Sequence, residues 1–213
     1  MSEFSLTLAL LLLAAYLLGT IPFGLLLARI LGGKDVREHG SGNIGATNVS
    51  RVAGPVAGIL TLILDTAKGA AAVWIAARFA DHNATAMILA GISALAGHSF
   101  PIWLKFNGGK GVATALGVFL VLSPSAALAA LLVFVLTFAF WRYVSLASLG
   151  AAAAMPLLIY FLWAPGHAPP LAVSIGTLLA AALIFYKHRG NMRRLTERTE
   201  PKYALRKSKG DSE

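Results

Sequence analysis

The sequence predicts an all-α integral membrane protein of about seven spanning helices, with the N-terminus outside and the C-terminus in the cytoplasm. Of its 213 residues, 57% are hydrophobic and only 13% are charged, whereas about a quarter of the residues in soluble domains are charged. Apolar stretches long enough to cross a bilayer recur along the chain. These observations predict a single transmembrane domain over residues 1–200 and a basic, flexible cytoplasmic tail over 201–213.

The spans are predicted from apolar stretches, because a helix needs roughly 20 mainly apolar residues to cross a bilayer. The candidate stretches, of which the fourth is short, are 5–30, 54–78, 84–104, 111–123, 125–141, 144–163 and 170–187. The first is too long for a signal-peptide core, so we expect it to be retained, and Pro22 predicts a kink in it. Pro124 separates the fourth and fifth spans, since proline has no amide hydrogen to continue a helix. One bent helix over 111–141 is the alternative.

The charges predict the orientation of the chain. Its net charge is +9, from 18 Lys and Arg against 9 Asp and Glu. With an external N-terminus, all but two of these cations fall on the cytoplasmic side; Arg78 lies outside and Lys68 lies within a span. The positive-inside rule explains this pattern, so we predict no nucleic-acid partner. The absence of cysteine excludes disulfides and thiolate chemistry.

The first predicted cytoplasmic loop alternates glycines with Ser, Thr and Asn and ends in an Arg. Small residues let backbone amides approach an anion, and hydroxyl and amide side chains add donors. A flexible linker is the alternative, but Ile44, Val49 and Val52 recur at helical spacing and favour a loop packed against the membrane domain. The candidate ligand-binding residues are Ser41, Gly42, Asn43, Gly45, Thr47, Asn48 and Arg51.

The second predicted cytoplasmic loop places three glycines around one lysine, directly before an apolar helix. This arrangement indicates a phosphate site at a helix N-terminus. It is not a P-loop, because Leu104 stands where that motif needs its first glycine and no strand precedes it. A histidine at the inner end of the third span either lines the same site or is structural. The candidates here are His98, Gly108, Gly109, Lys110, Gly111 and Thr114.

Polar residues elsewhere give weaker signals. His188 and Asn191 lie one helical turn apart in the basic tail, although an anchor for anionic lipid headgroups also explains the charge of that tail. Ser145 lies just inside the membrane at the start of a span and is a candidate hydrogen-bond donor to phosphate.

Asp65 and Lys68 are spaced i, i+3 inside the second span. We expect them to form a structural ion pair, because an isolated charge at that depth is costly; a direct contact with substrate is the alternative.

Three groups of residues resemble the cytoplasmic motifs of one family. They are Gly-Ser-Gly-Asn-Ile-Gly-Ala-Thr-Asn-Val (40–49) with Arg51, Gly-His-Ser-Phe-Pro (97–101) with Gly-Gly-Lys-Gly-Val-Ala-Thr (108–114), and His188, Asn191, Arg194 and Glu200. In these motifs the chain resembles the bacterial acyl-phosphate:glycerol-3-phosphate acyltransferases, the PlsY family, and the resemblance spans about residues 20–200. The chain departs from the usual pattern at Met192, where isoleucine is common, and at Arg198, where glycine is common.

The resemblance implies that an acyl phosphate gives its acyl chain to the sn-1 hydroxyl of glycerol 3-phosphate, forming lysophosphatidic acid and inorganic phosphate. It implies one acyltransferase domain in the bacterial inner membrane, with the site on the cytoplasmic face, and we expect a monomer without cofactor or metal. The implied catalytic residues are Ser41, Arg51, Lys110, His188, Asn191 and Glu200. The implied substrate- and phosphate-binding residues are Gly42, Asn43, Gly45, Thr47, Asn48, His98, Gly108, Gly109, Gly111, Thr114, Ser145 and Arg194.

Phosphate is a good leaving group, so we expect direct transfer without a covalent enzyme intermediate. The chain accordingly has no cysteine and no Gly-x-Ser-x-Gly nucleophile elbow. The general base is left open among His98, His188 and the substrate phosphate. The alternative function is a transporter or flippase of phosphorylated lipid, a class in which binding sites lie near the midplane. Here the polar motifs cluster on one side and only Asp65 and Lys68 lie deep, which favours an enzyme.

Overall fold

The computed structural model describes residues 2–164 and 166–203, and the regular elements of this part of the chain are helices. They are α1 (Ser2–Gly19), α2 (Phe23–Gly32), α3 (Ala46–Ala53), α4 (Pro55–Phe79), α5 (Ala84–Ser99), the 3-10 turn η1 (Ile102–Leu104), α6 (Val112–Leu122), α7 (Pro124–Trp141), α8 (Val144–Leu162), α9 (Leu171–Lys187) and α10 (Arg189–Thr196). The predicted all-α class is confirmed. α6 and α7 are separate helices that meet at Ser123, so the alternative of one bent helix is wrong. Residues 204–213 of the predicted tail lie outside the described residues.

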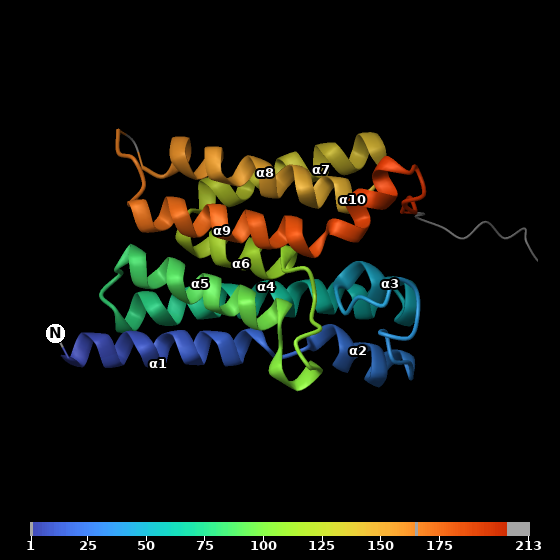
Figure 1. Ribbon diagram of the computed structural model, residues 1–213, viewed down its shortest axis with the longest axis horizontal. Helices are drawn as coiled ribbons and strands as arrows, with labels where there is room; N and C mark the ends of the chain where they lie inside the picture. Colours follow the sequence, from blue (N-terminus) through green and yellow to red (C-terminus); the bar gives the residue numbers. More distant parts are fainter. Residues whose placement is uncertain (1, 165, 204–213) are drawn as a thin grey trace, which may run out of the picture.

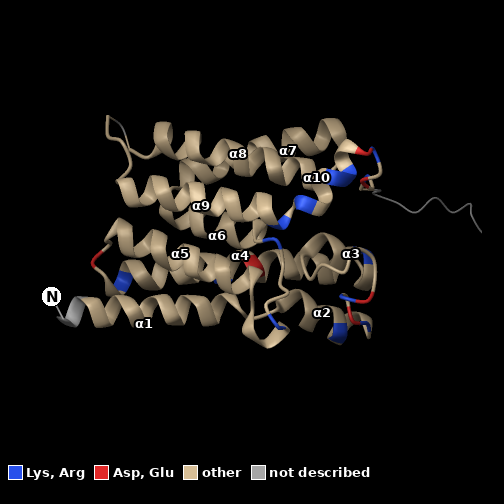
Figure 2. Ribbon diagram, in the orientation of Figure 1, with Lys and Arg blue, Asp and Glu red and all other residues tan. Residues whose placement is uncertain are grey.

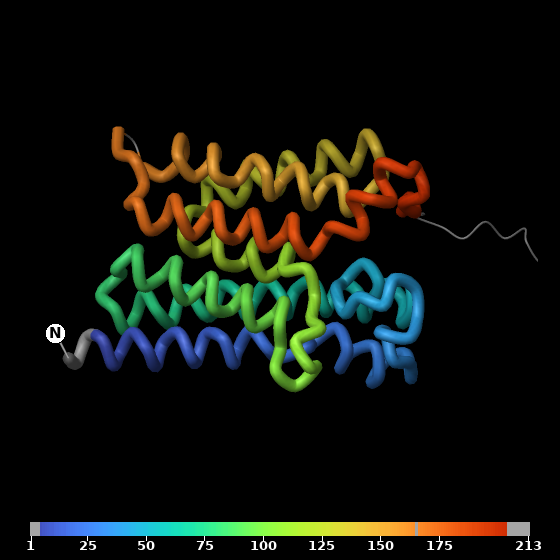
Figure 3. Tube along the Cα trace, viewed as in Figure 1, coloured from blue at the N-terminus to red at the C-terminus, as the bar shows by residue number. Residues whose placement is uncertain are grey.

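The long helices run side by side along the longest axis of the molecule (Figure 1). α1 forms one edge and packs on α5, α4 packs on α6, and α7 packs on α8 at the opposite edge (Figure 1). The short helices α2, α3 and α10 gather at one end of the bundle, which we call the α3 end (Figure 3). The first described residues of α1 lie at the other end (Figure 3). The loops that carry the predicted motifs are thereby brought to a single end of the bundle.

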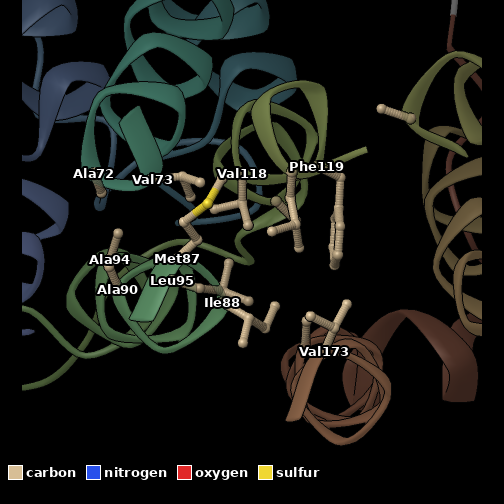
Figure 4. Packing of buried hydrophobic residues seen from close by; sticks show 14 of the residues in the cluster. Ala72, Val73, Met87, Ile88, Ala90, Ala94, Leu95, Val118, Phe119 and Val173 are labelled. Carbon is tan, nitrogen blue, oxygen red and sulfur yellow. The ribbon is translucent and has the colours of Figure 1, made fainter. Parts of the chain in front are cut away.

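The core of the bundle consists of small and medium apolar side chains. Figure 4 shows side chains of α4, α5, α6 and α9 pointing toward one another, among them Val73, Ile88 and Val173. Small residues let membrane helices approach closely, and a side chain at Gly69 of α4 would collide with the backbone of Thr114 in α6. The close packing of α4 on α6 fixes where α6 begins, immediately after the glycine-lysine loop.

By length and composition alone, five or six segments of the described residues qualify as spans, against about seven predicted. Within the described residues, the segments long and apolar enough to cross a membrane are Ser5–Gly32, Pro55–Phe79, Ala84–Leu104, Pro124–Trp141 and Val144–Leu162, and the bent pair α9–α10 is a sixth if it counts as one span. α6 has only 11 residues. At a rise of 1.5 Å per residue such a helix covers roughly half of a hydrocarbon core of about 30 Å. The predicted stretch, 111–123, is almost as short, and the loop before it folds back beside the end of α5.

The first span is broken at Pro22, where the sequence predicts a kink. α1 ends at Gly19 and α2 begins at Phe23. The carbonyl of Ile21 at this break accepts a hydrogen bond from Lys68 Nζ of α4 at 2.9 Å. Lys68 also pairs with the buried carboxylate of Asp65 at 2.8 Å. The predicted structural ion pair is therefore confirmed, and it supports the break as well.

The first glycine-rich loop packs against the bundle, as its apolar spacing predicts. Ile44 and Val49 are buried in one cluster with Leu25 of α2 and Ala57 of α4. A free linker would leave these side chains exposed, so the alternative of a flexible linker is wrong. The loop leads directly into α3, whose last turn carries Arg51.

The charges follow the one-sided pattern of the sequence. Figure 2 shows Lys and Arg concentrated at the α3 end of the bundle. The last turns of α2, α3 and α10 contribute Arg29, Arg51, Arg193 and Arg194. Arg78 lies in the last turn of α4, at the opposite end.

Candidate active site

Two adjoining cavities lie toward the α3 end of the bundle. The polar cavity, of about 180 Å³, is lined by the two glycine-rich loops, the start of α8, and α10 with the segment that follows it. The apolar cavity, of about 450 Å³, lies among α3, α4, α6, α7, α8 and α9. The residues that line both cavities are Ala46, Thr47, Leu62, Val112, Ala113, Phe134, Val144 and Ser148. A molecule with a polar head and an apolar chain can therefore occupy both cavities at once.

Most of the predicted site residues line the polar cavity. They are Ser41, Asn43, Gly45, Thr47, Asn48, Arg51, His98, Lys110, Gly111, Ser145, His188, Asn191, Arg194 and Glu200. Gly42, Gly108, Gly109 and Thr114 are not among the lining residues. Thr114 is fully buried and its backbone lies against Gly69 of α4. The structure thus separates residues that face the cavity from residues that shape the loops around it.

Asn48 organises the first loop from within. Its Nδ2 lies 2.9–3.1 Å from the carbonyl oxygens of Val36, His39 and Asn43, and its Oδ1 accepts a hydrogen bond from the Ser41 amide at 3.0 Å. The side chain is buried, so these bonds satisfy groups that water does not reach. Asn48 therefore holds the loop in shape, with Ser41 at the wall of the cavity.

The second loop is held against the end of α5. The amides of Gly108 and Gly109 donate to the carbonyls of Ser99 and His98, at 3.2 and 3.0 Å. Lys187 Nζ of α9 donates to the same Ser99 carbonyl at 2.9 Å. These bonds place the next residue of the loop, the predicted phosphate-binding lysine, at the wall of the polar cavity.

Replacing Gly108 by alanine is expected to lower kcat/KM about a hundredfold. A Cβ at this position would collide with the backbone of His98 and Ser99, which cannot move aside, and misplacing a reacting group by about 1 Å costs roughly that factor. Gly150→Ala in α8 is the matched control, because a Cβ there makes only ordinary contacts. Steady-state kinetics of the two purified variants make the test, and wild-type activity of Gly108→Ala would contradict it.

A chain of hydrogen bonds joins the second loop to the C-terminal segment. Lys110 Nζ donates to Asn191 Oδ1 at 2.6 Å, and Asn191 Nδ2 donates to Glu200 Oε1 at 2.6 Å. Glu200 also accepts from Ser145 Oγ at 2.7 Å and from Arg194 Nε at 2.7 Å. The carboxylate is nearly buried, so the five side chains of this network fix one another in place.

The charges of this network follow from its surroundings. Burial lowers the pKa of Lys110 to about 8, with the Glu200 carboxylate opposing this effect and nearby Arg194 and Arg51 adding to it. Burial raises the pKa of Glu200, but its three hydrogen-bond donors outweigh burial and hold that pKa below its usual range. At neutral pH Lys110 is a cation close to the pH at which it loses its charge, and Glu200 is a carboxylate.

The Arg51 guanidinium and the Nε2 atom of His188 are not occupied by other side chains of the described residues. Within the described residues, the Arg51 guanidinium has neither a hydrogen-bond nor an ion-pair partner, although it lines the polar cavity. His188 Nδ1 lies 2.8 Å from the carbonyl oxygen of Ile184. Because a carbonyl only accepts, Nδ1 carries the hydrogen and the neutral ring keeps Nε2 as an acceptor.

Asp65, Pro201 and Tyr203 line the two cavities but were not among the predicted site residues. Asp65, expected to form an ion pair with Lys68, also lines the polar cavity, and His98 Nδ1 lies 3.6 Å from its carboxylate. Pro201 lines the polar cavity and Tyr203 lines the apolar one. The i, i+3 spacing of Asp65 with Lys68 was the only available signal for the first. No periodicity or motif pointed to the last two.

Metal-binding side chains are not grouped at this site. Within residues 2–164 and 166–203 no cluster of three or more His, Asp or Glu side chains is arranged to hold a metal ion. The expectation of an enzyme without metal or cofactor stays a prediction.

A polar cavity rich in cationic and amide donors, joined to an apolar cavity between membrane helices, defines a membrane enzyme that holds an anionic group and an apolar chain together. The sequence model of the family described as glycerol-3-phosphate acyltransferase matches residues 9–198. The chain therefore belongs to the glycerol-3-phosphate acyltransferase family and is an integral, multi-pass membrane enzyme. The resemblance seen in the three motifs is confirmed.

Individual relatives agree with this assignment. The chain is 50% identical over 192 residues to the glycerol-3-phosphate acyltransferase of Syntrophotalea carbinolica, covering 90% of this chain and 95% of that protein. It is 50% identical over 197 residues to that of Myxococcus xanthus, covering 91% and 98%. Both relatives are matched over nearly their whole length, so the family assignment applies to the described bundle as a whole.

Two solved structures share the fold. The chain is 40% identical, with a TM-score of 0.86, to a crystal structure of PlsY, an integral membrane glycerol 3-phosphate acyltransferase, in its glycerol 3-phosphate form, covering 92% of this chain and 96% of that one. For the lysophosphatidic acid form the identity is 38%, the TM-score 0.82, and the coverage 92% and 95%. The fold and the enzyme class predicted from the sequence are thus confirmed.

Proposed function

We propose that the chain transfers an acyl group from an acyl phosphate directly to the sn-1 hydroxyl of glycerol 3-phosphate, releasing lysophosphatidic acid and inorganic phosphate. The observation that carries this proposal is the shared wall of the polar and apolar cavities. An acyl phosphate has a dianionic head on an apolar chain, and this pair of cavities matches both parts. The solved relatives, which are glycerol 3-phosphate and lysophosphatidic acid forms, support the choice of acceptor and product.

The phosphates are bound by the cationic side of the polar cavity. Arg51 has no partner among the described residues and is available for a substrate phosphate, whereas Lys110 is fixed by Asn191. The Ser41 hydroxyl and the loop amides beside it add neutral donors. Holding two substrates in one geometry in this way removes much of the entropic barrier to a reaction between them.

The acyl carbon is then attacked by the glycerol hydroxyl. His188 Nε2, left as an acceptor by the Nδ1 hydrogen bond to Ile184, orients that hydroxyl. Lys110 stabilises the negative charge that develops on the carbonyl oxygen and on the leaving phosphate. The oxygen–carbon bond to glycerol forms as the bond from the acyl carbon to the phosphate oxygen breaks, and the hydroxyl proton passes to the departing phosphate.

A covalent acyl-enzyme is not required by this site. Ser145 is the hydroxyl in the polar cavity that donates to a carboxylate, Glu200. Because two further donors also stabilise the ionised form of Glu200, this carboxylate is a weak base and does not activate the serine. Direct transfer needs only a good leaving group, which phosphate supplies.

The test is an assay of the purified full chain with palmitoyl phosphate and labelled glycerol 3-phosphate, with palmitoyl-CoA and palmitoyl acyl carrier protein in parallel. Formation of lysophosphatidic acid from the acyl phosphate alone supports the proposed donor. Turnover from a thioester donor, with none from the acyl phosphate, would overturn it. Intact-protein mass spectrometry during a single turnover tests direct transfer, because an acyl-enzyme adds the mass of the acyl chain.

We expect kcat/KM to fall as the pH rises through about 8, the pKa to which burial lowers Lys110. Below that pH the ammonium group is charged and binds phosphate; above it the neutral amine does not. In Lys110→Arg the fall should move to higher pH, because a guanidinium stays charged. Rate profiles from pH 6 to 10, corrected for spontaneous hydrolysis of the donor, make the comparison. Coincident profiles of wild type and variant would contradict it.

We propose that the α3 end faces the cytoplasm, so that the N-terminus lies outside and the site draws on cytoplasmic glycerol 3-phosphate. The cationic residues at this end support the orientation through the positive-inside rule. The chain has no cysteine, so single cysteines report orientation directly. A membrane-impermeant maleimide applied to spheroplasts should label Ala168→Cys, between α8 and α9, and spare Lys34→Cys at the α3 end. The reverse labelling would refute the orientation.

A further inference from the structure

The segment after α10 crosses from the polar cavity to the apolar one. We call residues 200–203 the strap. At its start Glu200 is held by Ser145, Asn191 and Arg194. Pro201 lines the polar cavity and Tyr203 lines the apolar cavity. The family model matches residues 9–198, so Pro201, Lys202 and Tyr203 lie outside the matched region.

Tyr203 joins two walls of the apolar cavity. Its amide donates to the carbonyl of Arg142, the residue after α7, at 2.9 Å. Its ring meets the edge of Phe138 in α7 with the centroids 5.9 Å apart. Its hydroxyl lies 3.5 Å from the hydroxyl of Ser50 in α3. One side chain therefore contacts α7 on one side and α3 on the other.

These two walls belong to different parts of the bundle. α3 packs on α2 and α4, whereas α7 packs on α6 and α8. The apolar cavity is lined from both sides, by Ser50 and Ile59 of the first group and by Phe134 and Phe138 of the second. Tyr203 therefore contacts both sides of the apolar cavity, and the strap that carries it begins at the polar cavity.

Tyrosine suits such a position chemically. Its ring offers an apolar face, and its hydroxyl offers a polar edge, which is why it is common where one end of a side chain is dry and the other is wet. Here the ring packs on Phe138 and the hydroxyl points to Ser50. The head end of an acyl chain, where hydrocarbon meets the phosphate, has the same change of polarity.

We propose that Tyr203 is a positioning residue for the acyl donor, which closes the cavity between α3 and α7 beside the head end of the acyl chain. It holds the first carbons of the chain against the shared wall of the two cavities and keeps water from the acyl carbon. This role rests on the proposed acyl phosphate donor. It leaves the binding of glycerol 3-phosphate to the polar loops.

Tyr203→Ala is expected to raise the KM for palmitoyl phosphate about tenfold, since loss of one well-packed aromatic contact is worth roughly that factor. The KM for glycerol 3-phosphate should stay within twofold. The fraction of donor hydrolysed by water rather than transferred should rise. Tyr203→Phe keeps the ring against Phe138 and should restore most of the donor affinity. Lys202→Ala is the matched control, because this exposed neighbour contacts the ring of Tyr143 and does not line either cavity.

The readouts separate positioning from a merely structural role. An unchanged KM for palmitoyl phosphate in a folded Tyr203→Ala protein would overturn the proposal. Equal increases in both KM values would overturn it as well, because they would mean that the variant only disturbs Glu200 and the polar site. If wild-type protein fails to use palmitoyl phosphate, the donor assignment fails separately. The same comparison of KM values is then made with the donor that the wild type does use, and an unchanged value would again refute the role of Tyr203.

Discussion

Lys110→Ala is expected to lower kcat/KM about 10³-fold while the protein still folds. The change removes the cation that faces the reacting phosphate, and removal of one such preorganised donor costs roughly 10²–10³ in rate. It also leaves Asn191 Oδ1 without the donor that lies 2.6 Å away. Asn191 and the hydrogen-bond network around Glu200 are then held less firmly. Initial rates of lysophosphatidic acid formation by purified protein measure the effect, and thermal unfolding in detergent checks the fold.

Lys105→Gln is the matched control for this variant. Lys105 belongs to the same loop, but its side chain is exposed and does not line the polar cavity. Its replacement removes one positive charge from the same region and should leave the rate within twofold of wild type. If both variants lose activity alike, the general basicity of this end of the bundle matters and the specific position of Lys110 does not. More than a tenth of the wild-type rate in Lys110→Ala would contradict its role in stabilising developing charge.

Much of the fold is predictable because a bilayer imposes simple rules on sequence. Apolar stretches located most helices to within a few residues, for example 144–163 against Val144–Leu162. The number of spans is harder to predict, because length alone does not decide it. Residues 111–123 are apolar but short, and Val112–Leu122 packs closely on α4 within the bundle. No local property of the sequence reports how deep in the bundle a helix begins.

Part of the site was predictable from the sequence, because clusters of polar residues without an evident structural role indicate a binding site. Lys110 lies in a loop rich in small residues, Arg51 lies in the helix that follows another such loop, and both line the polar cavity. The same signal is ambiguous for glycine, because glycines that approach a ligand and glycines that approach backbone look alike in a sequence. Gly111 lines the cavity, whereas Gly108 packs on the end of α5. Tyr203 was beyond prediction, since its partners are more than 50 residues away in the sequence.

Replacing either member of the buried Asp65–Lys68 pair is expected to cost about 3–5 kcal/mol of the free energy of unfolding. The two groups lie 2.8 Å apart with side chains 3% and 1% exposed, so removal of one leaves a charge that water does not reach. Lys68→Met and Asp65→Asn keep the approximate shapes. Chemical unfolding in detergent micelles measures each change and that of the double variant.

The double variant decides what this pair does. If mutual neutralisation is its main role, Asp65→Asn/Lys68→Met should lose less stability than the sum of the single variants, by about 2 kcal/mol or more. Lys68 also donates to the Ile21 carbonyl at 2.9 Å, where the first span is broken, and Asp65 lies 3.6 Å from His98, beside the second loop. Additive losses of stability would mean that each residue stabilises the protein mainly through its own separate contact and not through the ion pair. In that case Lys68 supports the broken helix, Asp65 supports the histidine behind Lys110, and activity should depend on Asp65 more than on Lys68.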